Sequence, residues 1–587
     1  MKLMHAALPL MVALPAAGAQ TGTPHAEPAR PEDVRLADSV IVHRADEYFS
    51  RLASLGHNGG VLIIRDGRVL LRRSYGFADR DKGIRADSAT VYNIGSITKQ
   101  FTAAAILRLE ELGKLRVTDP IGRYLPNVPA DKQGITLHHL LTHTAGLESD
   151  FSPSDYEPTT RDEYLRRALT SRLRSVPGTT HYYANSGYSL LAAIIEIVTG
   201  AEYELALTEL VLRPAGMLET GYRAPQWSAS RVAHGYQNGR DWGTIVDRLA
   251  TPGSPYWALR GNGGLATTLD DFAHWEQALT TRRVLTDSSR RKFMTGYVNE
   301  GPAALSQYAY GWAVTRSSRG TPVVMHNGGN GVYVAEFIRF VDEGVSVFVT
   351  STNAALPATP MARALEHIVF GEPYALPPVS VTLTPTAVQR MSGRYRLADG
   401  STLVLRGGAG GLVAEASGQR AFILLTSGDT ASSRVAPTLN LRADTIARAV
   451  LAGNVGPLVR AIGEGEDSAA VAGRERELMA SRVERFGAFR SLDVLGTVPA
   501  GRAEQRTTVR ITFERGVATN LYTWGPAGFL IDIAAQPFAP TPLLAISETE
   551  FQTFDLRSPS AMRLRVEGEN LVALTPQGTI PLVRQRD

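Results

Sequence analysis

Ser96 and Lys99 lie three positions apart and supply the two groups that nucleophilic catalysis by a serine needs. A serine hydroxyl is a weak nucleophile near neutral pH, so it needs an adjacent base, and a lysine can serve if its pKa is lowered. Burial and the positive end of a helix dipole both disfavour a protonated lysine. The pair therefore predicts a serine nucleophile with a lysine base, although the motif by itself is also compatible with a chance pairing.

A helix is expected to position this pair. Apolar residues recur from Phe101 to Leu112 at spacings of four, four and three, which is one face of a helix. Gly113 follows where the helix should end. Ser96 would then lie at the start of the helix, and Lys99 would share its face.

Tyr183 and Asn185 form a second candidate pair, on a turn that follows Pro177-Gly178. An apolar helix is expected just after them, at residues 190–198. A phenol can shuttle a proton, and a carboxamide can both donate and accept hydrogen bonds. Both side chains could point into a cleft; the alternative is a turn that packs an aromatic ring.

Strands are expected before and after the Ser96 helix. Residues 61–65 and 69–73 are apolar runs around Asp66-Gly67, which is a strong hairpin turn signal. Further strand patterns surround a third polar group, in which glycines would let the backbone approach a ligand closely. An N–H group that binds an oxyanion needs such an approach. This third group consists of His326, Asn327, Gly328 and Gly329.

Three other patterns are interpreted as structural. Residues 289–292 repeat the Ser-x-x-Lys spacing in a charged run without an apolar helical face, which indicates a surface segment. Residues 136–147 contain three histidines, but no Asp, Glu or Cys within the expected helix could join them as a metal ligand. Residues 261–271 are glycine-rich but lack the Gly-Lys-Ser/Thr ending of a phosphate-binding loop.

Composition describes a multidomain globular chain and excludes several classes. At 587 residues the chain is too long for one core, and its hydrophobic and charged fractions of 44% and 20% are ordinary. The net charge of +4 is spread without a basic block, which argues against nucleic-acid binding. Without cysteine there are no disulfides.

An apolar leader that ends in Ala17-Gly18-Ala19 is typical of a secretory signal peptide cleaved after Ala19. No membrane span is expected after this leader.

Taken in order and spacing, Ser96-x-x-Lys99, Tyr183-x-Asn185 and His326-x-Gly328 resemble the motifs of the serine β-lactamase-like hydrolases. The nearest branch contains class C β-lactamases, D-Ala-D-Ala carboxypeptidases, D-aminopeptidases and esterases. The resemblance covers roughly residues 40–372. It implies an α/β (α+β) β-lactamase/transpeptidase-like fold, in which an antiparallel sheet is flanked by helices and joined to an all-helical subdomain.

The resemblance also implies an acyl-transfer mechanism. Ser96 would attack a carbonyl, and Lys99 with Tyr183 would take the proton and pass it to the leaving group. The N–H groups of Ser96 and Gly329 would bind the oxyanion. Water would then clear the acyl-enzyme, with no need for a metal or another cofactor.

The remaining motif residues would bind the substrate. Asn185 would orient Lys99 and the acyl amide, while Asn327 and Gly328 would lie along the substrate. His326 would face a substrate carboxylate or polarise the tyrosine of the second motif. Because β-lactamases carry lysine at the position of His326, this departure argues against a true β-lactamase.

The C-terminal third is expected to hold two small accessory folds. Its first and last parts resemble a lipocalin-like β-barrel, and its middle resembles an α+β module of the nuclear-transport-factor type, either inserted into the barrel or following it. The expected divisions are 1–19 signal peptide, 20–38 disordered tail, 39–373 hydrolase domain, 374–386 linker, 387–439 with 541–587 β domain, and 440–540 α+β module.

Three functions follow from these motifs. The first is a periplasmic or secreted serine hydrolase that cleaves small esters or peptide bonds, including those of D-amino-acid peptides. The second is a non-catalytic protein that binds peptidoglycan peptides or penicillin on the same fold, and the third is a class C-type β-lactamase. The sequence leaves the substrate and the oligomeric state open.

Overall fold

The computed structural model describes residues 35–585 and divides them between two compact units, which meet in sequence between Leu376 and Pro377. The expected signal peptide lies outside the described residues. Asp38, the last residue of the expected tail, is the first residue of helix α1. No helix in the described part of the chain is both long and apolar enough to cross a membrane. Within the range 35–585, the structure does not describe residues 152–153, 238, 250–255, 301–304, 409–410, 428–433, 463–467, 500–503, 526–527, 538–539 and 557–561.

The first unit is built on an antiparallel sheet of eight strands in the order β2-β1-β14-β13-β12-β11-β10-β9. Strands from both ends of the unit therefore meet in one sheet, with β1 paired to β14. The strands are β1 (Gly59–Arg65), β2 (Arg68–Tyr75), β9 (Val298–Asn299), β10 (Gln307–Tyr308), β11 (Ala313–Arg316), β12 (Pro322–Gly329), β13 (Val334–Phe340) and β14 (Val345–Ser351).

The expected hairpin is confirmed in β1 and β2. Asp66 and Gly67 connect the strands with φ angles of 52° and 74°. Two left-handed residues are what a type I′ turn requires, and its twist matches that of the strands it joins. Along β2, Leu71 and Tyr75 are buried whereas Arg72 and Arg73 are exposed, so this strand is only partly covered.

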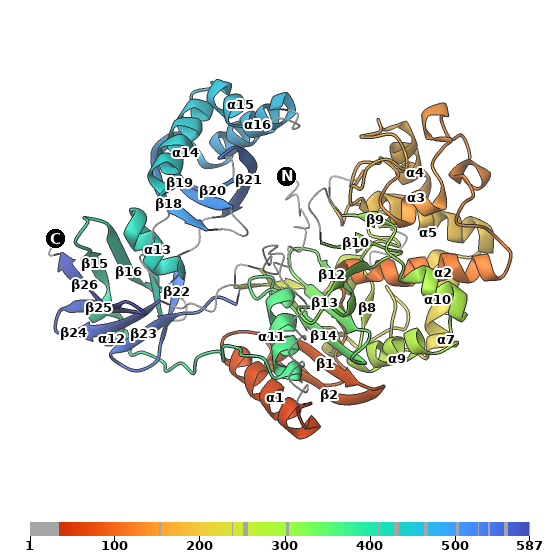
Figure 1. Cartoon of the computed structure of the whole chain (residues 1–587), viewed down its shortest axis with the longest axis horizontal. Coiled ribbons are helices and arrows are strands. Elements are labelled where there is room, and N and C mark those ends of the chain that lie inside the picture. The colour runs from red at the N-terminus through yellow and green to blue at the C-terminus, as the bar shows by residue number, and fades with distance from the viewer. Residues whose placement is uncertain are drawn as a thin grey trace, which may run out of the picture. The chain divides into compact units, whose positions relative to one another are not determined.

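Helices cover both faces of this sheet. Helices α1 (Asp38–Ser54) and α11 (Ala358–Phe370) lie beside β1, β2, β13 and β14 (Figure 1). Helix α9 (Leu269–Thr280) packs on the opposite face, where Phe272 stacks on Phe348 with ring centroids 3.8 Å apart.

The remaining elements of the unit are β3 (Phe77–Asp79), β4 (Ile84–Arg85), β5 (Tyr92–Asn93), η1 (Gly95–Ile97), α2 (Thr98–Glu111), η2 (Ile121–Arg123), η3 (Ala130–Lys132), α3 (Leu137–Leu141), α4 (Arg161–Thr170), α5 (Asn185–Thr199), α6 (Tyr203–Leu207), η4 (Thr208–Leu212), α7 (Arg213–Ala215), η5 (Ala229–Arg231), β6 (Gly235–Gln237), β7 (Arg240–Gly243), α8 (Ile245–Leu249), β8 (Ala266–Thr267) and α10 (Asp287–Phe293).

Helix α2 occupies the centre of the helical part. Every residue from Thr98 to Leu107 is buried, so the helix is covered on nearly all sides rather than along the single face expected. Helices α5, α6, α10 and η4 pack around it. Three consecutive alanines, at 103–105, let these neighbours approach closely. The polar residues within α2 are therefore enclosed in the core, which gives its lysine an unusual environment.

The second unit contains a closed barrel and a separate four-stranded sheet. The barrel is interrupted in sequence, because the segment between β17 and β22 forms the sheet with its helices (Figure 1). The barrel strands are β15 (Gly393–Arg396), β16 (Thr402–Gly408), β17 (Gly411–Ser417), β22 (Thr541–Ala545), β23 (Glu550–Thr553), β24 (Arg563–Glu567), β25 (Asn570–Thr575) and β26 (Gly578–Gln585). The other elements are α12 (Pro385–Met391), α13 (Gln419–Ser427), α14 (Ala436–Leu451), α15 (Gly456–Ala461), α16 (Ser468–Phe486), β18 (Phe489–Pro499), β19 (Gln505–Phe513), β20 (Gly516–Trp524) and β21 (Leu530–Pro537).

A buried carboxyl group on β13 makes the stability of the first unit depend on pH. Glu336 is fully buried, and its Oε2 accepts a hydrogen bond of 2.6 Å from Thr359 on α11. Its Oε1 has no hydrogen-bond partner among the described residues. Burial raises the pKa of Glu336 to about 7, and the Thr359 hydroxyl opposes that rise.

We expect Glu336→Gln to stabilise the protein at pH 8 but not at pH 5. A raised carboxyl pKa means that the folded state binds the proton more tightly, so stability falls as the pH rises toward 7. The ionised Glu336 carboxylate should lower the free energy of unfolding of the wild type by roughly 3 kcal/mol at pH 8. A glutamine at this position cannot ionise and should remove that loss. Urea unfolding of both proteins at the two pH values measures the difference. An equal difference at pH 5 and pH 8 would contradict the assignment.

Candidate active site

Ser96 lies on a 3-10 turn, η1, directly before α2 rather than within the helix. The Asn93 side chain fixes this turn, accepting from Gly95 N at 3.1 Å and donating to Leu265 O at 3.1 Å. Among residues 91–107, Ser96 alone is not buried. The turn therefore presents one hydroxyl to the surroundings from an otherwise enclosed segment.

Lys99 is fully buried and reaches three oxygen atoms. Its Nζ lies 2.8 Å from Asn185 Oδ1, 2.8 Å from the Asn262 carbonyl oxygen and 3.0 Å from Ser96 Oγ. The two carbonyl-type oxygens can only accept. A neutral amine therefore donates both of its hydrogens to them and directs its lone pair at the Ser96 hydroxyl.

Burial favours that neutral amine. It lowers the pKa of Lys99 well below the usual lysine value, and the charges of Asp155 and Asp150 only partly oppose the shift. The pKa of this lysine is therefore shifted in the direction that a lysine base at neutral pH requires.

The second motif lies at the start of α5. Asn185 is the first residue of this helix, which begins five positions earlier than the expected 190–198. Tyr183 precedes it, and the centroid of its ring is 4.8 Å from Lys99 Nζ. Burial raises the pKa of the Tyr183 phenol, and an interaction with the Ser96 hydroxyl opposes that rise. Tyr183 thus borders both members of the first motif as a neutral phenol.

The third motif touches the Ser96 turn through backbone atoms. A Cβ atom on Gly328 would lie 2.0 Å from the Ile94 carbonyl oxygen and 2.9 Å from Ser96 N. A Cβ atom on Gly95, whose φ is 52°, would lie 2.4 Å from Gly329 N. Glycine at 95 and 328 is therefore what lets β12 approach the turn, and it brings the amides of Ser96 and Gly329 close together.

His326 forms hydrogen bonds that the sequence did not identify. Its Nδ1 lies 2.5 Å from the Asn327 carbonyl oxygen and its Nε2 lies 2.9 Å from the Tyr308 hydroxyl. The carbonyl can only accept, so Nδ1 carries the proton and Tyr308 donates to Nε2. Burial lowers the pKa of His326 to about 3, and a positive charge on Lys99 would lower it further. The ring is neutral, and its hydrogen bonds go to Tyr308 and the backbone rather than to Tyr183.

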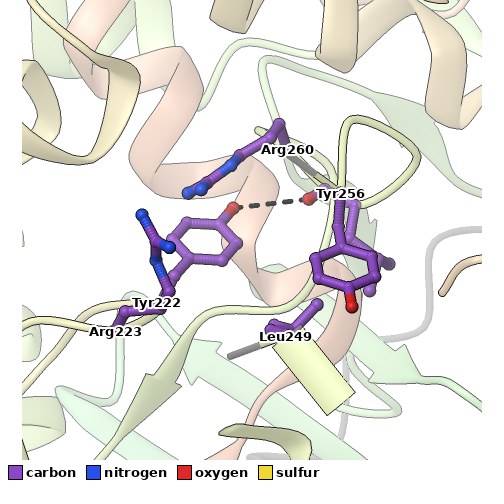
Figure 2. Close-up of a pocket in the computed structure, with 6 residues that line it drawn as sticks. Tyr222, Arg223, Leu249, Tyr256 and Arg260 are labelled. Carbon is purple, nitrogen blue, oxygen red and sulfur yellow. Dashed lines mark hydrogen bonds between the residues drawn. The ribbon is translucent and has the colours of Figure 1, made fainter. Parts of the chain in front are cut away.

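The glycine-rich loop at 261–271 contributes a group that the sequence did not identify, the Asn262 carbonyl that binds Lys99. Tyr222 supports this loop by donating to Leu259 O at 3.4 Å (Figure 2). It also accepts from Gly261 N at 3.2 Å. The small hollow around Tyr222 is lined by none of the predicted site residues. A glycine-rich composition signals such a loop, but no side-chain type signals a carbonyl acceptor.

The second Ser-x-x-Lys pair has a structural role. Ser289 is buried near the start of α10, where its N–H donates to the Thr286 side chain, so the expected surface position is wrong for the serine. Lys292 forms an ion pair of 2.6 Å with Glu110. Within the part of the chain that the structure describes, no three His, Cys, Asp or Glu residues are arranged to hold a metal ion.

The profile of the beta-lactamase family matches residues 50–371, which include all three motifs. The chain belongs to the beta-lactamase family. It therefore has the β-lactamase/transpeptidase-like fold that the motifs implied and belongs to a family of serine hydrolases.

Several known proteins are similar to this chain over different lengths. A penicillin-binding protein of Bacillus subtilis strain 168 is 28% identical over 64% of this chain and 87% of the relative. A second chain of that strain, named as penicillin-binding protein PbpX, is 31% identical over 48% of this chain and 69% of its own length. The octameric penicillin-binding protein homologue of Pyrococcus abyssi is 17% identical with a TM-score of 0.49, over 93% of this chain and 98% of that structure.

Proposed function

We propose that this protein is a serine hydrolase that forms an acyl-enzyme at Ser96 and cleaves small esters or short peptides. The observation that carries the proposal is the hydrogen bonding of Lys99. Two fixed acceptors, Asn185 Oδ1 and the Asn262 carbonyl, use both hydrogens of a neutral amine and leave its lone pair for the Ser96 hydroxyl. This is the arrangement that a buried lysine needs in order to act as a general base.

In the acylation step, Ser96 Oγ attacks the substrate carbonyl carbon while Lys99 Nζ, together with the Tyr183 hydroxyl, takes its proton. The N–H groups of Ser96 and Gly329 stabilise the oxyanion, and one such donor typically contributes a factor of about 10²–10³ in rate. Collapse of the tetrahedral intermediate expels the leaving group, which takes the proton through the Tyr183 hydroxyl. Water then attacks the acyl-enzyme with the same groups as acid and base.

The third motif supports neutral substrates. His326 is uncharged at physiological pH, so it supplies no fixed positive charge for the carboxylate of a β-lactam. Asn327 is exposed beside it and offers a carboxamide to the substrate instead. We therefore favour esters and peptide amides over β-lactams, and we propose secretion or a periplasmic location on the N-terminal sequence pattern alone.

A fluorophosphonate probe tests the proposal without knowledge of the substrate. It should label Ser96 of the purified protein, and peptide mapping should find no label at Ser186 or Ser289. A panel of short-chain esters, D-amino-acid peptides and a chromogenic cephalosporin then ranks the substrate classes. Labelling at another serine, or no labelling at all, would overturn the proposed function.

The variant His326→Lys should raise reactivity toward a cephalosporin more than toward a neutral ester. A lysine introduces the charge that a β-lactam carboxylate can bind, and a charge-assisted hydrogen bond is expected to change the cephalosporin-to-ester ratio of kcat/KM about tenfold. The ratio is measured for both proteins at pH 7.5. Efficient cephalosporin turnover by the wild type would show that another group binds the carboxylate.

A further inference from the structure

His143 holds the segment that carries Tyr183 on both sides. Its carbonyl oxygen accepts from Tyr182 N at 2.8 Å, and its ring Nδ1 accepts from Ala184 N at 3.1 Å. The backbone amides on either side of Tyr183 are thus bound to one residue, which lies 40 positions away in sequence. Such a two-point attachment restricts the direction in which the Tyr183 side chain leaves the backbone.

The ring of His143 also contacts Tyr183 directly. Their centroids are 4.3 Å apart with an angle of 38° between the planes. On another side, the His143 ring lies 4.6 Å from that of Tyr308, which donates to His326. One buried imidazole therefore touches the tyrosine of the second motif and the partner of the third.

The conformation and the charge of His143 both suit this role. Its φ is 57°, a left-handed value that is uncommon for a residue other than glycine. Such strain persists only where the surroundings enforce it. Burial lowers the pKa of His143 well below its usual value, so the ring is neutral and Nδ1 can accept from Ala184 N. Its Nε2 has no hydrogen-bond partner among the described residues.

We propose that His143 is a positioning residue for the reaction, which sets the Tyr183 hydroxyl beside Ser96 and Lys99 through its hydrogen bond to Ala184 N. The proposal rests on the proposed function, since it assigns the tyrosine a part in activating the serine. A misplacement of about 1 Å in a reacting group can cost a factor of about 10² in rate. Loss of the Nδ1 acceptor should therefore slow the activation of Ser96 without removing any group that reacts.

Two variants separate the hydrogen bond from the rest of the side chain. His143→Asn keeps an oxygen acceptor near the position of Nδ1 and tolerates a left-handed φ. His143→Phe keeps a ring of similar shape but leaves the Ala184 N–H without an acceptor. His138→Phe is the matched control, because His138 also lies in the 136–147 segment but bonds to the Tyr310 hydroxyl, at 2.8 Å.

The measured quantity is the second-order rate constant for labelling of Ser96 by a fluorophosphonate, with thermal unfolding recorded for each variant. We expect His143→Phe to slow labelling about ten- to a hundredfold, and His143→Asn and His138→Phe to stay within about threefold of the wild type. Wild-type labelling by His143→Phe, or equal losses in the Asn and Phe variants, would overturn the proposal. Should His143→Phe fail to fold, His143→Gln replaces it, because glutamine moves the acceptor one bond further out.

A double-mutant cycle shows whether His143 acts through Tyr183. In a Tyr183→Phe background, His143→Phe should change the labelling rate less than about twofold, since the hydroxyl that it positions is already gone. A purely structural role would instead give the same loss in both backgrounds and overturn the proposal. Absence of Ser96 labelling in the wild type contradicts the proposed function, whereas labelling that ignores His143 contradicts only this inference.

Discussion

Replacing Ser96 with alanine is expected to lower kcat/KM for the best ester or peptide substrate by roughly 10⁴–10⁶-fold. The hydroxyl is the only atom of the turn that is both outside the core and within hydrogen-bond distance of Lys99 Nζ. Alanine fits the same backbone, because the Ser96 side chain contributes no hydrogen bond to the η1 turn, which Asn93 holds. Thermal unfolding of the variant should therefore stay close to that of the wild type.

Ser289→Ala is the control for this experiment. It removes the serine of the second Ser-x-x-Lys pair, which is buried near the start of α10. Its kcat/KM should equal that of the wild type within error, and fluorophosphonate labelling should be unchanged. If Ser96→Ala keeps more than about 1% of the wild-type kcat/KM, the loss is far smaller than expected. Another group would then be the nucleophile.

Local signals in the sequence predicted local structure well. Asp66-Gly67 predicted the hairpin because the two residues alone determine the turn. Thr268 is of a residue type that favours helix N-caps, and its side chain accepts from Asp271 N at the start of α9. Each of these features depends on side chains within a few positions of one another, so a single sequence contains all the information that they need.

Long-range packing could not be predicted in the same way. The Asn262 carbonyl that binds Lys99 lies 163 positions away, and any residue type carries such a carbonyl. Tyr308 was missed as the partner of His326 because only the folding of β10 against the site brings the two together. The complete burial of α2 likewise comes from helices that are distant in sequence. The motif predicted which side chains matter, whereas the fold determines their partners.

In the C-terminal unit, too, local elements follow from the sequence whereas long-range strand pairing does not. The charged segment 474–485 and the segments 508–513 and 521–524, which are rich in β-branched and aromatic residues, lie within α16, β19 and β20. Closure of the barrel by pairing of β15 with β26 joins residues 187 to 191 positions apart, such as Arg394 with Gln585, and no local pattern encodes this pairing. The likeness of the barrel to lipocalins and of residues 440–540 to the nuclear-transport-factor fold stays a prediction.

Replacing Lys99 with methionine is expected to lower kcat/KM by about 10²–10⁴-fold, the usual contribution of a positioned acid–base group. Methionine fills a similar volume but can neither accept the Ser96 proton nor donate to Asn185 and Asn262. Lys292→Met is the matched control, since its lysine forms a half-buried ion pair with Glu110, and it should retain wild-type turnover. Retention of wild-type kcat/KM by Lys99→Met would show that the base lies elsewhere.

The Lys99→Met variant should also change how kcat/KM and the free energy of unfolding depend on pH. The reaction needs neutral Lys99, so wild-type kcat/KM should rise with pH through the lysine pKa, which burial lowers well below the usual value, and then level off. The unfolded chain binds a proton on this lysine that the folded chain has released, so the free energy of unfolding should also rise with pH between the lowered pKa and the usual one. Methionine removes the titrating group, and both slopes should flatten in Lys99→Met. Rate and urea-unfolding profiles of the two proteins over the same pH range measure this, and a slope that survives in Lys99→Met must belong to another group.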